Sequence, residues 1–114
     1  MIIDVVTLFP SMFEGVIGQS ILKNAQDKNL VEILVHDLRT FSADKHKKVD
    51  APPYGGGPGM VLTTEPVFNA VRYLRENGRA DSKLILLTPA GKPFKQVVAQ
   101  ELSQEAGLIL LCGH

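Results

Sequence analysis

The sequence has one cysteine, no net charge and no long apolar segment, and each shortage excludes a class of protein. The single thiol, Cys112, cannot form a disulfide within the chain or contribute to a cysteine-rich metal site. Twelve basic residues balance twelve acidic ones, so composition favours neither a nucleic acid nor an acidic membrane as a partner. No apolar run approaches the roughly 20 residues of a membrane span, and the N-terminus lacks the pattern of a signal peptide. We therefore expect a cytoplasmic protein without a membrane partner.

Familiar nucleotide-binding and metal-binding motifs are also missing. No G-x-G-x-x-G lies between an expected strand and helix, and no Walker sequence occurs, which excludes the classical dinucleotide and P-loop sites. His36 and His114 lack the carboxylate or cysteine spacing of a metal site, so we expect no metal. Cys112 ends the apolar run LILLC and is predicted to be a buried structural thiol rather than a nucleophile.

Apolar segments alternate between strand-like and helix-like patterns along all 114 residues. Strands are expected in residues 2–8, 31–38, 83–91 and 108–114, and helices after Pro10, over 21–25, from Thr64 to before Gly78, and over 93–107. This alternation predicts a parallel α/β sheet in a single domain. The apolar faces expected on three helices are Met12, Phe13, Val16 and Ile17; Val67, Ala70, Val71 and Leu74; and, facing inward, Phe94, Val97, Val98 and Leu102.

Ligands of an open parallel sheet bind beyond the carboxyl ends of its strands, and two such ends are rich in small residues. One expected strand ends in Leu87-Thr88-Pro89-Ala90-Gly91, and the last ends in Cys112-Gly113-His114. Small residues there allow backbone groups to approach the edge of a nucleoside. The alternative, favoured on spacing alone, is that the prolines and glycines only form turns.

About 20 residues after the second expected strand lack any hydrophobic period and include the segment PPYGGGPGM. Two interpretations of its glycines remain open: a flexible hinge, or a loop that folds closely over a planar ligand with Tyr54 available to stack. The basic residues 45–48 are candidates for phosphate contacts. Because Asp44 and Asp50 flank them, a solvated loop surface is the favoured alternative.

Four motifs, LFPSMFE, KVDAPPYGGGPGMVL, LTPAGKPF and LILLCGH, occur in an order and spacing that resembles bacterial tRNA (guanine-N1)-methyltransferases of the TrmD type. The resemblance covers essentially the whole chain. It implies a SPOUT α/β fold with a deep trefoil knot, and a homodimer with its sites at the subunit interface. It also implies methyl transfer from S-adenosylmethionine to N1 of the guanosine immediately 3′ of the anticodon, tRNA position 37.

Family roles can be carried over to particular residues. The resemblance implies that Leu87, Thr88, Pro89 and Gly113 line the S-adenosylmethionine pocket. It further implies that one loop lies near the cofactor and the incoming guanine, with the residues Tyr54, Gly55, Gly56, Gly57, Pro58 and Gly59.

The chain ends at His114, where the family continues with Tyr-Glu-Gly, a knot-completing segment that carries the catalytic Asp and an Arg, and a tRNA-binding domain. The resemblance therefore implies that residues 1–114 are the N-terminal part of one SPOUT domain, truncated before the trefoil-knot segment and with no second domain. Methylation at N1 of guanine requires removal of its proton, and no residue here, Asp50 included, matches the family's carboxylate. We expect this part to be inactive alone. A non-catalytic α/β module for nucleoside binding or dimerisation remains the alternative.

Overall fold

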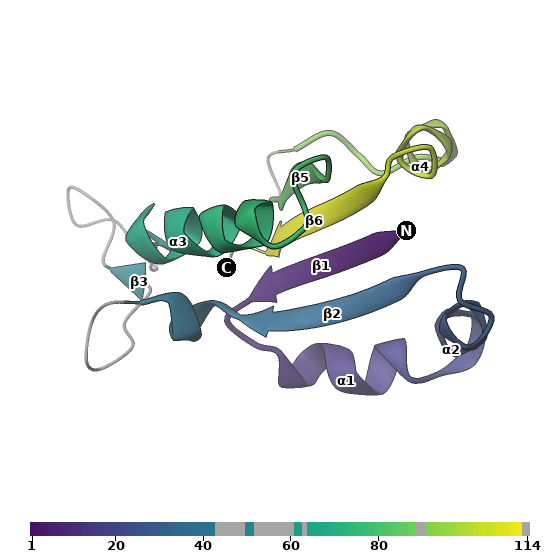
Figure 1. The fold of residues 1–114 in the computed structure, drawn as a ribbon, viewed down its shortest axis with the longest axis horizontal. Helices are drawn as coiled ribbons and strands as arrows, with labels where there is room; N and C mark the ends of the chain where they lie inside the picture. The colour runs from purple at the N-terminus through teal and green to yellow at the C-terminus, as the bar shows by residue number, and fades with distance from the viewer. Residues whose placement is uncertain (43–49, 52–60, 63, 89–90, 113–114) are drawn as a thin grey trace.

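The computed structural model describes residues 1–42, 50–51, 61–62, 64–88 and 91–112. Its main sheet has four parallel strands in the order β2-β1-β6-β5 (Figure 1). The strands are β1 (Ile2–Thr7), β2 (Glu32–Asp37), β5 (Lys83–Leu87) and β6 (Gly107–Cys112). The parallel α/β sheet predicted from the sequence is confirmed.

Helices connect these strands much as the sequence patterns predict. They are α1 (Ser11–Ile17), α2 (Ser20–Asp27), α3 (Thr64–Glu76) and α4 (Gln96–Leu102). A short 3-10 helix, η1 (Leu38–Phe41), follows β2 directly, and two-residue strands β3 (Asp50–Ala51) and β4 (Val61–Leu62) pair antiparallel. The sequence did not predict η1 or this small second sheet. Helix η1 begins where it does because the Asp37 carboxylate accepts a hydrogen bond from the Arg39 backbone N–H, at 2.9 Å.

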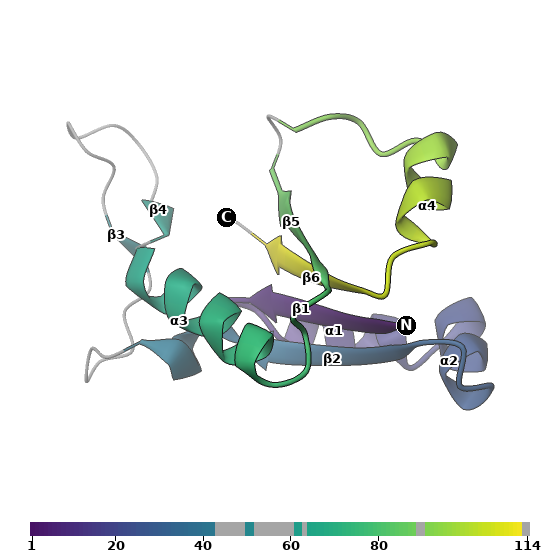
Figure 2. The same ribbon diagram turned by 45° about the horizontal axis from the view of Figure 1, so that its top comes forward.

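The core lies between α3 and one face of the sheet; Figure 2 shows α3 in front of the strands and α1 behind them. The buried cluster comprises Val6, Leu8, Leu38, Ala70, Leu74, Ile109 and Leu111. The predicted inward positions Ala70 and Leu74 are at most 1% exposed, and Val67 packs against the cluster while partly buried. Helix α3 ends as predicted, since Gly78 adopts a left-handed φ of 90° that glycine tolerates best.

The inward face predicted for residues 93–107 is wrong for Phe94 and Val97, which are exposed, while Val98 and Leu102 are partly buried. The apolar face predicted for the helix after Pro10 is largely exposed as well. Helix α1 has no buried residue, and Met12 is 71% exposed. Helix α4 begins only at Gln96, because Lys95 is extended, so Phe94 precedes the helix and is 74% exposed. Both helices have only seven residues and cover little of the sheet in the described part of the chain. Apolar side chains on them are therefore available for contacts with other segments or molecules.

One buried carboxylate ties the sheet to the connection after α3. Asp4 interrupts the apolar run of β1 and is completely buried. Its Oδ1 lies 2.8 Å from His36 Nε2 on β2. Arg79 donates to both carboxylate oxygens, from Nε to Oδ2 at 2.8 Å and from Nη2 to Oδ1 at 3.2 Å. The hydrogen bonds that Arg79 donates to Asp4 are the main cause that raises the pKa of Arg79, so this guanidinium stays charged at any ordinary pH.

Candidate functional site

The four parallel strands bring their carboxyl ends to one edge of the sheet, where ligands of such sheets bind. The register pairs Thr7 with Asp37 at the ends of β1 and β2. It likewise pairs Leu87 with Cys112 at the ends of β5 and β6. The two chain positions that the sequence singled out as strand ends are therefore neighbours in space.

The end of β5 presents an exposed side chain beside the end of β6. Leu87 is 46% exposed, and Thr88 is exposed as well. The Thr88 carbonyl accepts a hydrogen bond from the Gly91 N–H at 3.1 Å, which is the turn that the alternative interpretation expected at this glycine. A turn and a ligand contact are compatible here, because the turn leaves the Leu87 side chain exposed.

Several predicted site residues lie outside the described residues. They are Pro89 and Gly113 of the expected cofactor pocket, the loop Tyr54, Gly55, Gly56, Gly57, Pro58 and Gly59, and the basic residues 45–48. The roles assigned to these residues remain predictions.

The ends of β1 and β2 carry a network that the sequence analysis missed. Thr7 Oγ1 accepts a hydrogen bond from the Phe9 N–H at 3.0 Å, which fixes the chain as it leaves β1. The Arg39 guanidinium donates to the Leu8 carbonyl and lies over the Phe9 ring, 6.0 Å from its centroid. The sequence did contain a signal for these contacts. Thr7 stands two positions before Phe9, and Asp37 two positions before Arg39, a spacing at which such side chains often accept a hydrogen bond from the backbone. This end of the sheet thus holds an exposed ring and a cation in fixed positions.

Cys112 is partly rather than fully buried at the end of β6. Burial raises the pKa of its thiol, so the neutral form dominates near neutral pH and the thiolate needed for attack is scarce. His36, one of the two histidines considered above as possible metal ligands, contacts the Asp4 carboxylate. Among the described residues, no three histidine, cysteine or acidic side chains gather as metal ligands.

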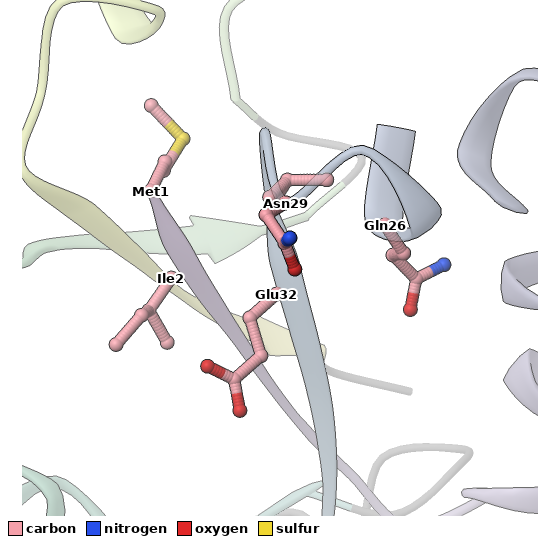
Figure 3. A pocket seen from close by; sticks show the side chains of 6 residues that line it. Met1, Ile2, Gln26, Asn29 and Glu32 are labelled. Atoms are coloured by element: carbon pink, nitrogen blue, oxygen red, sulfur yellow. The ribbon is translucent and has the colours of Figure 1, made fainter. Parts of the chain in front are cut away.

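An open hollow lies at the opposite edge of the sheet, beside the amino ends of β1 and β2 (Figure 3). It is lined by Met1, Ile2, Gln26, Asn29, Val31 and Glu32. The Gln26 amide already donates to the carbonyls of Ile17 and Leu22, at 2.6 and 3.0 Å, so it serves the turn between α1 and α2. Because parallel sheets bind ligands at the carboxyl edge, we place the candidate site there rather than in this hollow.

Comparison with known proteins assigns the family. The family described as tRNA (Guanine-1)-methyltransferase TrmD matches residues 1–114. The chain belongs to the TrmD family. Curated TrmD relatives named tRNA (guanine-N(1)-)-methyltransferase include those of Dictyoglomus turgidum, 57% identical over 98% of this chain, and Shouchella clausii, 53% identical over 98%. The crystal structure of tRNA (m1G37) methyltransferase from Aquifex aeolicus superposes on all of this chain with a TM-score of 0.91 and 34% identity.

The chain spans about half the length of the TrmD relatives it matches. It covers 44% of the Dictyoglomus turgidum protein, 46% of the Shouchella clausii protein and 51% of the Aquifex aeolicus chain. The fold and the TrmD family are thus established for this chain. In the part of the chain that the structure describes, no helix is long and apolar enough to cross a membrane.

Proposed function

We propose that this chain is the N-terminal part of a SPOUT methyltransferase domain that methylates N1 of guanosine 37 in tRNA with S-adenosylmethionine as the donor. The observation that carries the proposal is the match of the whole chain to the Aquifex aeolicus protein, which is named tRNA (m1G37) methyltransferase. Family membership supports the reaction class, tRNA (guanine-1) methylation. A tRNA substrate also supports a cytoplasmic location.

Leu87 and Thr88 are proposed to bind the adenosyl part of the donor, together with Pro89 and Gly113. The described part of this site fits such a group. An exposed leucine offers an apolar surface, and backbone groups at the end of a parallel strand offer hydrogen bonds to a purine edge. When bound, the donor would supply an electrophilic methyl group; the residues of this chain would hold and orient it. Residues 54–59 are proposed to lie near the donor and the guanine.

The guanine must lose its N1 proton as the methyl group arrives, so the complete site needs a proton acceptor. We assign no residue of this chain to that role. Asp50 belongs to β3, and its side chain is not among those that the structure describes. The resemblance to the family implies that an aspartate beyond residue 114 accepts the proton, and on that basis we propose that residues 1–114 are inactive alone.

A homodimer is the proposed assembly. The exposed apolar residues of the edge strand β5 favour a contact between this strand and further protein surface. Parallel sheets are normally covered on both faces, yet four of the five residues of β5 are exposed. Leu84 and Leu86, which point to the α3 face of the sheet, are 43% and 57% exposed. Apolar residues on both sides of an edge strand favour association with further protein surface.

The proposal can be tested by incubating the 114-residue chain with labelled S-adenosylmethionine and unmodified tRNA. The full-length Dictyoglomus turgidum relative is the positive control, and an extract from cells carrying an empty vector is the negative control. We expect transfer by the relative and none by this chain alone, since catalytic groups that act together leave little activity when one is missing. Transfer at a comparable rate would place every catalytic residue within residues 1–114 and would overturn our assignment of the proton acceptor.

A further inference from the structure

Helix α3 carries an arginine stacked on an exposed aromatic ring on the side that faces away from the core. Phe68 is 63% exposed. The Arg72 guanidinium carbon lies over the Phe68 ring, 5.4 Å from its centroid. The core side of the same helix is formed instead by Pro66, Ala70 and Leu74. Packing of the described core therefore does not account for the Phe68 side chain.

The Phe68–Arg72 pair is held in place by neighbouring groups. Arg72 Nη2 donates to Asn69 Oδ1 at 3.0 Å. The Asn69 amide in turn donates to the Phe41 carbonyl of η1 at 3.1 Å, so the arginine is linked to a second element. The Phe41 ring also packs against Tyr73, with ring centroids 5.6 Å apart. A guanidinium fixed in this way loses little side-chain entropy when a ligand stacks on it.

The pair lies at the same end of the molecule as the candidate site. Helix α3 begins beyond the carboxyl ends of β1 and β2, on the side of β3 (Figure 1), and Phe68 is in its second turn. Helix η1, which Asn69 contacts, also contributes Arg39 of the Phe9–Arg39 pair. One arginine–phenylalanine pair thus includes a residue of η1, and the other is linked to η1 through Asn69, near the carboxyl edge of the sheet.

We propose that Phe68 and Arg72 form a stacking surface for an unpaired base of the tRNA, a proposal that rests on the function proposed above. Unpaired RNA bases stack on aromatic rings and on guanidinium planes, and arginine also attracts the phosphate backbone. Within the described residues, the partners of Arg72 are a ring and an amide, both uncharged, so its charge is available to a phosphate. The surface therefore has the chemistry that single-stranded RNA requires.

The test uses the full chain that the gene encodes and two RNA probes of the same length, an anticodon stem-loop and a blunt duplex. Variants Phe68→Ala, Arg72→Ala and Arg72→Lys are compared with the unsubstituted protein in a binding titration. Control variants Ile21→Ala and Lys28→Ala remove an exposed apolar and an exposed charged side chain of the α2 region, near the amino ends of the strands. Melting temperatures verify that each variant is folded.

We expect Phe68→Ala and Arg72→Ala to weaken binding of the stem-loop about 5-fold or more, because loss of one base-stacking side chain typically costs at least that. Arg72→Lys keeps the charge but loses the plane, and is expected to weaken stem-loop binding by an intermediate factor. Duplex binding should change less, since its bases are already stacked. Control variants should bind as the unsubstituted protein does.

If the unsubstituted protein binds the stem-loop strongly and Phe68→Ala and Arg72→Ala bind it equally well, this inference is overturned and the proposed function is left intact. A changed oligomeric mass in Phe68→Ala with unchanged stem-loop affinity would overturn it too, and would assign the surface to contact with a second copy. If the unsubstituted protein binds no stem-loop, both this inference and the proposed function fail.

Discussion

Replacement of Asp4 by asparagine should destabilise the fold strongly although the two side chains have nearly the same size. The carboxylate is completely buried and accepts two hydrogen bonds from Arg79. An amide offers one oxygen in place of two and no charge. Arg79 would therefore keep its positive charge in a largely buried position without a compensating anion.

The expected size of the effect follows from how deeply the partners are buried. Breaking a buried ion pair by removing one partner typically costs about 3–5 kcal/mol. The side chains of Arg79 and His36 are 17% and 21% exposed and so keep part of their hydration. We therefore expect a loss of about 2–3 kcal/mol in the free energy of unfolding. For a domain of this size the melting temperature should fall by roughly 8–12 °C.

Urea and thermal unfolding of the Asp4→Asn variant measure this loss. Lys23→Ala is the control, because it removes an ion pair with Asp27 whose side chains are 59% and 61% exposed, and we expect an unchanged melting temperature. The double variant Asp4→Asn, Arg79→Gln should lose less stability than the sum of the single losses, since neither partner is then left alone. A fully additive double variant, or Asp4→Asn as stable as the Lys23→Ala control, would refute the role assigned to this contact.

Three further predictions concern other parts of the chain. Gly107→Ala should destabilise the fold by about 1–3 kcal/mol, because its Cβ would lie 2.5 Å from Ser82 Oγ and 2.9 Å from a β1 carbonyl oxygen. Gly15→Ala is the control and should not destabilise, because no atom lies within 4 Å of the added Cβ. Comparable urea midpoints for the two variants would contradict this prediction. Alkylation of Cys112 near neutral pH should be slower in the folded than in the urea-unfolded chain, because burial raises the pKa of the thiol. The stability that comes from the neutral thiol is present below its ordinary pKa of 9.0 and is lost at higher pH. Equal alkylation rates in the two states would argue against burial. In the complete enzyme, Gly59→Val should impair methyl transfer with little change in melting temperature, and unchanged turnover would favour the hinge interpretation of the loop.

Local patterns predicted most of the fold because each strand and helix leaves its own period in the sequence. Helix α3 is the clearest case, with Ala70 and Leu74 buried as expected and a left-handed Gly78 after its end. Burial of the shorter helices could not be predicted in the same way. The exposed Phe94 has the residue type of an inward position, but what covers it depends on surfaces that a local pattern does not describe.

The sequence could predict the position of the candidate site only from the shared direction of the parallel strands. Parallel strands must end at one edge, so the juxtaposition of Leu87 and Cys112 follows once the strands are known. Contacts between distant segments required the structure: Asp4 and Arg79 are 75 positions apart. The Arg72–Phe68 pair is a normal helical spacing of four, yet its exposure depends on which face of α3 meets the sheet.

Methyl transfer by the complete product of the gene tests the central claim most directly. The purified protein is incubated with labelled S-adenosylmethionine and two unmodified tRNA transcripts that differ only in having guanosine or adenosine at position 37, the position named for the Aquifex aeolicus enzyme. Digestion of the RNA and chromatography of the nucleosides identify the product. We predict label in N1-methylguanosine from the first transcript and none from the second. Label in another nucleoside, equal label in both transcripts, or no label in either would contradict the proposed function.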